Sequence, residues 1–434
     1  MDNTNDDVTL TSPDPARNAP SSPMAIAMLT NLYPPLGTGS STQSAQLARE
    51  LALRGHKVVV FTAAVVPGTP DHETTPEGVE IFRLPCRKLP DLAIFMNFPW
   101  FSATLHPRNL RFMTQVIRRH GIQVLHVHNH LFDMAFSGVW LSWKLGLPLA
   151  LTIHTYAQHP NFLYNAIFYP LDCIFLKHAV IDRADAVIAP DCNVQAYLSR
   201  RFRRNDGVFI PYGIAPPRPV PPEEEDSLRA EFGLHGKRVI LSLGQLHPLR
   251  NRITLIQALP EVIQAHPDVR LLIVGVVGHQ PTVDLVHELG LQNHVIFTGP
   301  QPHERIPAFQ RLASFSAVWV DYKNEDCKNA SFGIGVMEAM SYENAVISMG
   351  NIDTYGAGRL QDRKNIYLLE NDNPINVRNA LMNLLDNPAM AAAIGSEAAI
   401  FARNNFSWEN VAEQHILLYE ALKKKGSRAR QTSQ

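Results

Sequence analysis

The chain has 434 residues, which is too long for one ordinary core and suits two domains of about 200 residues each. Hydrophobic residues make up 45% of it and charged residues 18%, which is typical of a soluble globular protein. The formal net charge of −1 excludes a chain-wide attraction to nucleic acid, so we expect no nucleic-acid partner.

The charge is unevenly distributed along the chain. Residues 21–220 hold 18 Lys and Arg against 12 Asp and Glu, a net charge of +6. A basic N-terminal half favours an anionic acceptor or a peripheral contact with a membrane surface, and ordinary surface scatter is the alternative. Residues 162–181 come nearest to a membrane span, but polar residues interrupt them, so we predict a packed amphipathic helix.

Residues 1–22 are acidic and polar, without the apolar core of a secretion signal, and predict a disordered tail. The cysteines lie far apart with no CxxC spacing, which indicates reduced thiols in a cytoplasmic protein. They are Cys86, Cys173, Cys192 and Cys327.

Apolar strands and amphipathic helices alternate through the first half. The predicted strands lie within residues 24–33, 57–63, 79–85, 122–128, 148–155, 182–190 and 206–213, and the helices within 43–56, 108–120 and 136–146. Strict alternation of this kind predicts a parallel sheet covered on both faces. We therefore assign residues 23–212 to an N-terminal doubly wound lobe.

Residues 213–226, GIAPPRPVPPEEED, contain five prolines and predict a semi-rigid linker without helix or central strand. After the linker the alternation restarts. The predicted strands lie within 237–246, 269–275, 294–299, 316–322 and 345–350, with helices at 251–266, 283–291 and 303–313. We assign residues 227–404 to a second doubly wound lobe, 405–425 to a final helix and 426–434 to a polar tail.

Two glycine-containing turns are candidate anion sites. In PPLGTGSS, Gly37 and Gly39 would let a ligand approach the backbone, and the following helix would direct its N–H groups toward an anion. Thr42 stands where a GxGxxG dinucleotide fingerprint needs its third glycine, so that interpretation is weak, and a turn without a ligand remains the alternative. In SLGQLHPLRN, Arg250 could hold a diphosphate, or could be a solvated surface residue.

Several histidines end apolar strands. His126, His128 and His130 alternate and could share one face as metal ligands, although no acidic or cysteine partner accompanies them. His154 ends its strand alone, and either a site role or a structural role is open.

The stretch SFGIGVMEAM is the most informative. The backbone N–H groups of Phe332, Gly333 and Ile334 would lie at a helix N-terminus, ready for phosphate oxygens. Glu338 would project on the same side and could accept hydrogen bonds from ribose hydroxyls. A buried acid without such a partner is costly.

Together these motifs resemble the retaining glycosyltransferases of the GT-B fold, family 4 in particular. The resemblance runs from about residue 24 to 422 and rests on PPLGTGSS, VLHVHNHLF, LTIHT, ADAVIAP, IPYGI, LSLGQL, LLIVG, VIFTGPQPHERIP, FGIGVMEAM and FSWENV in that order. It implies an α/β fold of two Rossmann-like lobes facing a central cleft. It also implies that the final helix crosses back to the first lobe.

The resemblance further implies roles for individual residues. His154 and Glu338 correspond to the family's catalytic-site positions, His154 toward the transferred sugar and Glu338 toward the ribose as the second acid of an E-x7-E motif. The implied donor-binding set is Gly37, Thr38, Gly39, Ser40, Gln245, Arg250, Asn329, Ser331, Phe332, Gly333, Ile334 and Glu338. No metal site and no cofactor are implied, because the nucleotide-sugar is a co-substrate.

The chain departs from the family pattern at three places. Ala330 stands where the family has its first glutamate, so that Asn329 or Ser331 would take over sugar contacts. Gln245 replaces a phosphate-binding arginine, for which Arg252, Lys328 or Lys323 could compensate. The family's G-x-P-V after the helix reads Glu343–Asn344–Ala345–Val346.

Our hypothesis is a metal-independent enzyme that transfers a sugar, with retention, from a nucleotide-sugar to a glycan, lipid-linked or small-molecule acceptor. We expect it in the cytoplasm or at the inner membrane face. One alternative is a catalytically inactive GT-B relative that serves as a binding or regulatory partner, favoured by Ala330 and Gln245. A second, nucleotide-sugar epimerisation, is disfavoured by the order of the motifs.

Overall fold

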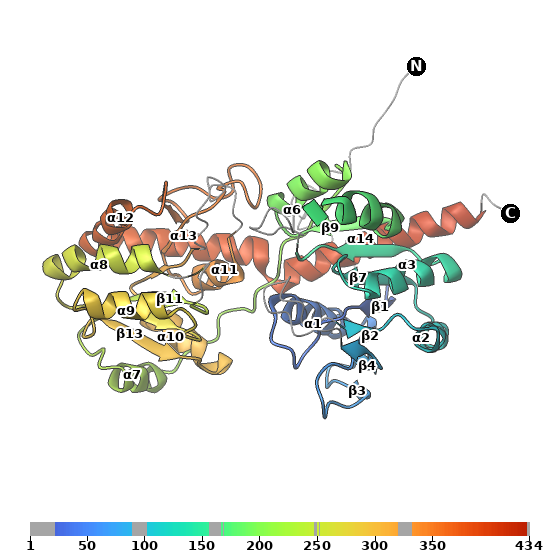
Figure 1. Ribbon diagram of the computed structural model, residues 1–434, viewed down its shortest axis with the longest axis horizontal. Coiled ribbons are helices and arrows are strands. Elements are labelled where there is room, and N and C mark those ends of the chain that lie inside the picture. Colours follow the sequence, from blue (N-terminus) through green and yellow to red (C-terminus); the bar gives the residue numbers. More distant parts are fainter. Residues whose placement is uncertain are drawn as a thin grey trace, which may run out of the picture.

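In the computed structural model, two α/β lobes lie side by side and the last two helices extend along both of them (Figure 1). The structure describes residues 22–88, 102–155, 166–167, 169–246, 250, 252–319 and 332–431. The predicted disordered tail, apart from residue 22, lies outside these residues, and so do Asn329, Ala330 and Ser331.

The N-terminal lobe is built on a sheet of order β10-β9-β8-β7-β1-β2-β4-β3, parallel except for the β3–β4 pair. Its strands are β1 (Ala25–Leu29), β2 (Lys57–Ala63), β3 (His72–Thr74), β4 (Glu80–Leu84), β7 (Val124–His128), β8 (Leu149–Thr152), β9 (Ala186–Ala189) and β10 (Val208–Phe209). A separate small hairpin pairs β5 (Arg87–Lys88) with β6 (Ser102–Ala103). The helices are α1 (Gly39–Leu53), α2 (Pro107–Arg119), α3 (Met134–Leu145), η1 (Leu171–Leu176), α5 (Lys177–Ala179), η2 (Ile181–Arg183), α6 (Cys192–Tyr197) and η3 (Leu198–Phe202).

Successive side chains of β1 enter two different cores, because they point to opposite faces of the sheet. Ala27 and Leu29 pack into the core beneath α2 and α3. Ile26 and Met28 pack into the core beneath α1 and α14 (Trp408–Gln431). The sheet is thus buried on both faces, as its continuous apolar strands predict.

The C-terminal lobe repeats this design with a parallel sheet of order β13-β12-β11-β14-β15-β16. Its strands are β11 (Arg238–Leu243), β12 (Val269–Val274), β13 (Val295–Gly299), β14 (Phe315–Ala317), β15 (Val346–Ser348) and β16 (Tyr367–Leu368). The helices are α7 (Pro222–Glu231), α8 (Ile253–Ala265), α9 (Gln280–Glu288), η5 (His303–Arg305), α10 (Ile306–Leu312), α11 (Ile334–Ser341), α12 (Pro374–Asp386) and α13 (Pro388–Phe406). The predicted fold class, two doubly wound lobes, is confirmed.

Two predicted boundaries differ from the structure. The linker was expected to exclude helix through residue 226, yet α7 begins at Pro222. Proline suits the first turn of a helix because its missing N–H would have no intrahelical partner there, and three glutamates follow in the favourable N-terminal turn. The final helix was expected to end at residue 425, and α14 continues to Gln431.

The chain crosses between the lobes twice, at Ile214 and at Ser407, and backbone contacts join the two crossings. The N–H of Ile214 donates to the carbonyl of Phe406 at 2.8 Å. The amide of Gln43 in α1 makes two hydrogen bonds with the backbone of Gly213, at 2.8 and 3.1 Å. Trp408 and Tyr419 of α14 then pack into the N-terminal lobe, which confirms that the final helix returns to it.

No helix of the described chain is long and apolar enough to cross a membrane.

Candidate functional site

A cavity of about 210 Å³ lies in the C-terminal lobe where β11, β14 and β15 reach their carboxyl ends. In doubly wound folds this is the edge at which ligands bind. The lining residues come from those three strand ends, the turn after β11 and the start of α11: Leu243, Gly244, Arg250, Val318, Trp319, Phe332, Gly333, Gly335, Val336, Glu338, Ser348 and Met349.

Arg250 bridges two glycines in this cavity. A Cβ atom at Gly244, which has φ of 122°, would lie 3.4 Å from Nη1 of Arg250. A Cβ atom at Gly333 would lie 3.7 Å from Nη2. The guanidinium therefore spans the space between the turn after β11 and the N-terminus of α11.

Arg252 has a different role from Arg250. It is buried with φ of 62°, its Nε donates to Ser242 Oγ at 2.5 Å, and its Nη1 donates to the carbonyl of Trp319 at 3.0 Å. These bonds fix the turn that carries Arg250 against β11 and the end of β14. The expectation that Arg252 could replace the missing family arginine finds no support in this geometry, because its donors point into the lobe.

The N-terminus of α11 opens toward the guanidinium. Its N-cap residue, Gly333, has extended backbone angles and no side chain that could cap the helix. The N–H of Val336 donates to the carbonyl of Gly333 at 2.9 Å, which leaves the first-turn N–H groups of Ile334 and Gly335 for a ligand. The helix dipole adds positive potential at the same point. The hydroxyl of Tyr355 donates to the carbonyl of Phe332 at 3.0 Å and holds the preceding residue in place.

Glu338 lies one turn inside α11 and lines the same cavity. Burial raises the pKa of its carboxyl, and the nearby His303 opposes that shift. Among the described residues no hydrogen-bond donor to this carboxylate is found. A half-buried acid without a donor is costly unless a ligand supplies hydroxyl groups.

The loop Gly37–Ser40 opens α1 in the other lobe. Thr38 is its N-cap and forms a capping box with Ser41, so that one first-turn N–H is already satisfied. Nothing lies within 4 Å of a Cβ atom at Gly37 or Gly39, which leaves the loop open to an approaching group. The cavity that holds Arg250 does not include this loop.

His154 follows β8 and is held at both ring nitrogens. Nε2 lies 3.0 Å from Nδ1 of His128, and Nδ1 lies 3.1 Å from the hydroxyl of Tyr212, whose ring stacks on the imidazole at an interplanar angle of 4°. Burial lowers the pKa of His154 to about 4, so the ring is neutral at pH 7. It lines a separate cavity of about 20 Å³ together with Gln43, Trp408 and His415.

The three alternating histidines do not share one face. His126 bonds Thr152 and Tyr419, each at 2.7 Å, on the side of β7 covered by α14. His130 lies beyond Asn129, whose φ of 75° breaks the strand alternation, and it contacts Tyr197 on the other side. No group of three or more potential metal ligands is found within the described ranges.

The structure therefore brings together Arg250, Phe332, Gly333 and Glu338 of the predicted donor set. Ile334 begins α11 but does not line the cavity, and Gln245 is exposed on the turn after β11. Trp319, Ser348 and Met349 also line the cavity and were not predicted. Their positions at or just beyond the ends of β14 and β15 were the available signal.

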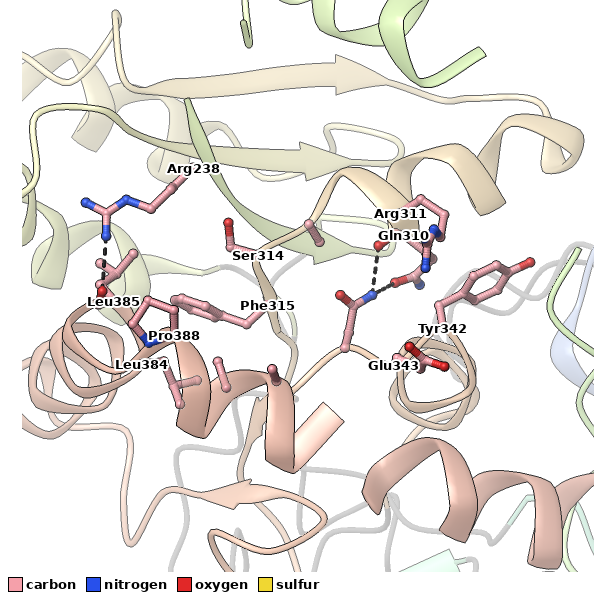
Figure 2. Close-up of a pocket in the computed structure, with 14 residues that line it drawn as sticks. Arg238, Gln310, Arg311, Ser314, Phe315, Tyr342, Glu343, Leu384, Leu385 and Pro388 are labelled. Carbon is pink, nitrogen blue, oxygen red and sulfur yellow. Dashed lines mark hydrogen bonds between the residues drawn. The ribbon is translucent and has the colours of Figure 1, made fainter. Parts of the chain in front are cut away.

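A second cavity of the same lobe, of about 370 Å³, opens at the opposite edge of the sheet (Figure 2). Arg238 and Phe315, the first residues of β11 and β14, line it, and Asn344 donates to the carbonyl and the side-chain oxygen of Gln310, both at 2.9 Å. No predicted site residue lies there.

Two doubly wound lobes whose final helix returns to the first lobe, with an arginine and an uncapped helix N-terminus in one cavity, define a glycosyltransferase of the GT-B class. The chain belongs to these enzymes by sequence as well. Residues 38–213 match the family model "Glycosyl transferase 4-like domain", and residues 224–400 match "Glycosyl transferases group 1".

Similar proteins agree with this assignment. A D-inositol 3-phosphate glycosyltransferase of Acidothermus cellulolyticus is 27% identical, over 92% of this chain and 91% of that protein. The solved structure of sucrose-phosphate synthase from Thermosynechococcus elongatus has a TM-score of 0.68 at 21% identity, covering 92% of this chain and 99% of its own. Anabaena Alr3699/HepE, solved with UDP and glucose, has a TM-score of 0.66 at 19% identity, covering 92% and 100%. At these identities the two structures establish the fold alone.

Proposed function

We propose that this glycosyltransferase takes its sugar from a nucleotide-sugar and transfers it, with retention at the anomeric carbon, to a glycan, lipid-linked or small-molecule acceptor. The observation that carries the proposal is the position of the Arg250 guanidinium between Gly244 and the uncapped N-terminus of α11. Glu338 completes the same cavity.

The donor fits this cavity in one orientation. The diphosphate would lie against Arg250 and the first-turn N–H groups of α11, where positive charge and free donors coincide. The ribose would lie one turn further along, where its hydroxyls would donate to the Glu338 carboxylate. The solved complexes of Alr3699/HepE with UDP and UDP-glucose support a nucleotide-sugar donor by analogy.

The transfer step needs a stabilised leaving group. The bond from the anomeric carbon to the diphosphate oxygen breaks, and the acceptor oxygen forms its new bond to the same carbon from the same face. The acceptor proton passes to the departing diphosphate. Arg250 and the α11 N-terminus would offset the charge that develops on that oxygen, so we propose that no metal is required.

We place His154 toward the transferred sugar. It would then exchange one of its two ring hydrogen bonds, to His128 or to Tyr212, for a sugar hydroxyl. The loop Gly37–Ser40 of the same lobe would approach the donor phosphates when the lobes close about the connection after Gly213. The free thiols Cys86, Cys173 and Cys192 are consistent with our expectation of a cytoplasmic location.

Calorimetry with UDP, GDP and ADP, followed by donor-hydrolysis and transfer assays on the nucleotide-sugars of the base that binds, tests the proposal. We expect one diphosphate to bind and the sugar of the matching nucleotide-sugar to be released or transferred. An α-configured donor should give an α-configured product. Binding without sugar release would favour the inactive-relative alternative, for which Gln245 is the described departure. Failure of all three diphosphates to bind would contradict the donor site.

A further inference from the structure

Between β8 and β9, the described residues that precede α5 carry an outward-facing apolar surface. Its exposed side chains are 39–64% accessible, and we call them the apolar face: Ile167, Tyr169, Leu171, Ile174 and Phe175. Large exposed apolar groups occur singly on most proteins, whereas a contiguous set marks an interaction surface.

This helical segment differs from an ordinary surface helix, because its acidic side chain faces the core and several apolar side chains face outward. The charged side chain, Asp172, is fully buried and accepts a hydrogen bond of 2.6 Å from the hydroxyl of Tyr197. Leu176 is buried beside it in the core, while Ile174 and Phe175 face outward. The Tyr197 hydroxyl satisfies Oδ2 of Asp172, whereas Oδ1 has no hydrogen-bond partner among the described residues. The apolar side chains that face outward make no such contact with the core, so packing within the lobe gives no reason for their position.

Helix α3 extends the apolar face. The ring of Phe136 lies 5.6 Å from that of Phe175. Trp143, seven residues later and therefore on the same side of the helix, is 80% exposed. Tryptophan and tyrosine are the side chains that favour the boundary between lipid and water.

Arg201 of η3 contacts the apolar face, and Arg200 and the C-cap residue Arg203 are near it in the chain; we call the three the η3 arginines. The guanidinium of Arg201 lies 4.4 Å from the ring centre of Tyr169, and Arg200 and Arg203 are exposed. Within the described part of the chain neither of these two has a carboxylate partner. The neighbouring exposed acids are occupied, since Asp182 pairs with Lys177 at 2.8 Å and Asp206 pairs with Arg204 at 2.8 Å.

We propose that the apolar face and the η3 arginines dock on an anionic lipid surface. Apolar side chains would enter the headgroup boundary, and the arginines would meet lipid phosphates. A second copy of the chain is less suited, because a two-fold contact through this patch would bring its unpaired arginines toward one another. The inference goes beyond the transfer reaction and does not depend on it.

The docking surface adjoins a contact between the two lobes. Helix α6, which leads directly into η3, begins at Cys192, and the N–H of Cys192 donates to the carbonyl of Thr354 in the other lobe at 3.0 Å. A chain docked in this way would hold this contact between the lobes near the membrane. An acceptor anchored in the lipid could then approach the place where the two lobes meet.

Co-sedimentation of the full chain with vesicles tests this docking. We expect binding to phosphatidylcholine vesicles that contain phosphatidylglycerol, weaker binding to phosphatidylcholine alone, and loss of the difference at high salt. The double variant Arg200→Gln/Arg203→Gln should bind the anionic vesicles roughly 30-fold less tightly, since each arginine near such a surface contributes about fivefold. Ile174→Ser should weaken binding about tenfold.

Matched substitutions in the other lobe provide the controls. Ile375→Ser on α12, where Ile375 is 55% exposed, and Arg311→Gln on α10 should leave vesicle binding unchanged. All variants should keep the melting temperature of the parent protein. The proposal is overturned if the parent chain does not prefer anionic vesicles, or if the patch variants bind like the controls. It is also overturned if sedimentation velocity shows a dimer that Ile174→Ser abolishes.

Discussion

The guanidinium of Arg250 lies beside the backbone of Gly333, close enough that a Cβ atom at Gly333 would be 3.7 Å from its Nη2. A cationic side chain from one turn and the N-terminus of α11 therefore converge on one point. Because Gly333 has no side chain, a ligand oxygen can reach both. This pairing is the basis of the proposed diphosphate site.

Replacing Arg250 tests the cationic half of that pair. Arg250→Ala should lower the affinity for a nucleoside diphosphate by about 10- to 100-fold, because a charge-assisted hydrogen bond contributes about 1.5–3 kcal/mol. Isothermal titration calorimetry measures the loss. Arg311→Ala, on the far edge of the sheet (Figure 2), is the matched control and should bind like the parent. Equal affinities for the two variants would contradict the assignment.

Glu338→Gln tests the ribose contact and has opposite effects on binding and stability. Burial raises the pKa of this carboxyl in the folded chain. The free energy of unfolding therefore falls as the pH rises through that raised pKa, and this loss is absent below the ordinary carboxyl range. The ligand-free variant should therefore melt at a higher temperature at pH 7 and lose this advantage in acid. Its affinity for a ribonucleoside diphosphate should fall, and it should no longer prefer the ribose form over the 2′-deoxy form. A parent protein that does not distinguish the two forms would argue against the contact.

Glu343 is strained at the position where the family has glycine. Its φ of 63° lies in the left-handed region, which costs a residue with a Cβ about 1–2 kcal/mol. Its carbonyl oxygen packs so closely on Gly395 of α13 that a Cβ atom there would clash. Glu343→Gly should raise the unfolding free energy by about 1 kcal/mol in urea denaturation. The control, Glu397→Gly on the exposed face of α13, should lower it by a similar amount. A loss of stability in Glu343→Gly would show that the glutamate side chain contributes more than the strain removes.

The buried His415 couples the fold to pH. Burial lowers its pKa to about 4, so the folded chain leaves it neutral while the unfolded chain protonates it below about pH 6.5. The contribution of His415 to the free energy of unfolding is thus fully present above pH 6.5 and is lost progressively as the pH falls toward 4. His415→Gln should reduce the proton uptake on unfolding by about one in this window, as measured by urea denaturation across pH. The exposed His235→Gln is the control, and an unchanged slope in His415→Gln would place the titration elsewhere.

Much of the fold was predictable because the long central strands of both lobes are apolar runs bounded by turn residues, whereas short polar strands such as β3 (HET) and β5 (RK) carry no such signal. The run KVVVFTA became β2, and VRLLIV became β12, each buried over nearly its whole length. The meeting of four residues of the proposed donor site in one cavity was also predictable, because parallel strands end at one edge and a glycine-rich helix start follows β14. The start of α7 was missed because proline density was taken to exclude helix, whereas proline is favoured at the first helical turn.

Other features depend on contacts that local sequence patterns do not contain. Arg252 looks like Arg250 in the sequence, and only the approach of Ser242 and the Trp319 carbonyl separates their roles. The alternation of His126, His128 and His130 predicted a shared face, but the left-handed Asn129 turns His130 away. The bond between His154 and Tyr212 joins residues 58 positions apart.

A crystal structure with the bound nucleoside diphosphate tests the central claim most directly. We expect density for the diphosphate beside the Arg250 guanidinium and the first turn of α11, with the ribose hydroxyls within hydrogen-bond distance of the Glu338 carboxylate. A nucleotide bound elsewhere, such as in the cavity lined by Arg238 and Gln310, would contradict it.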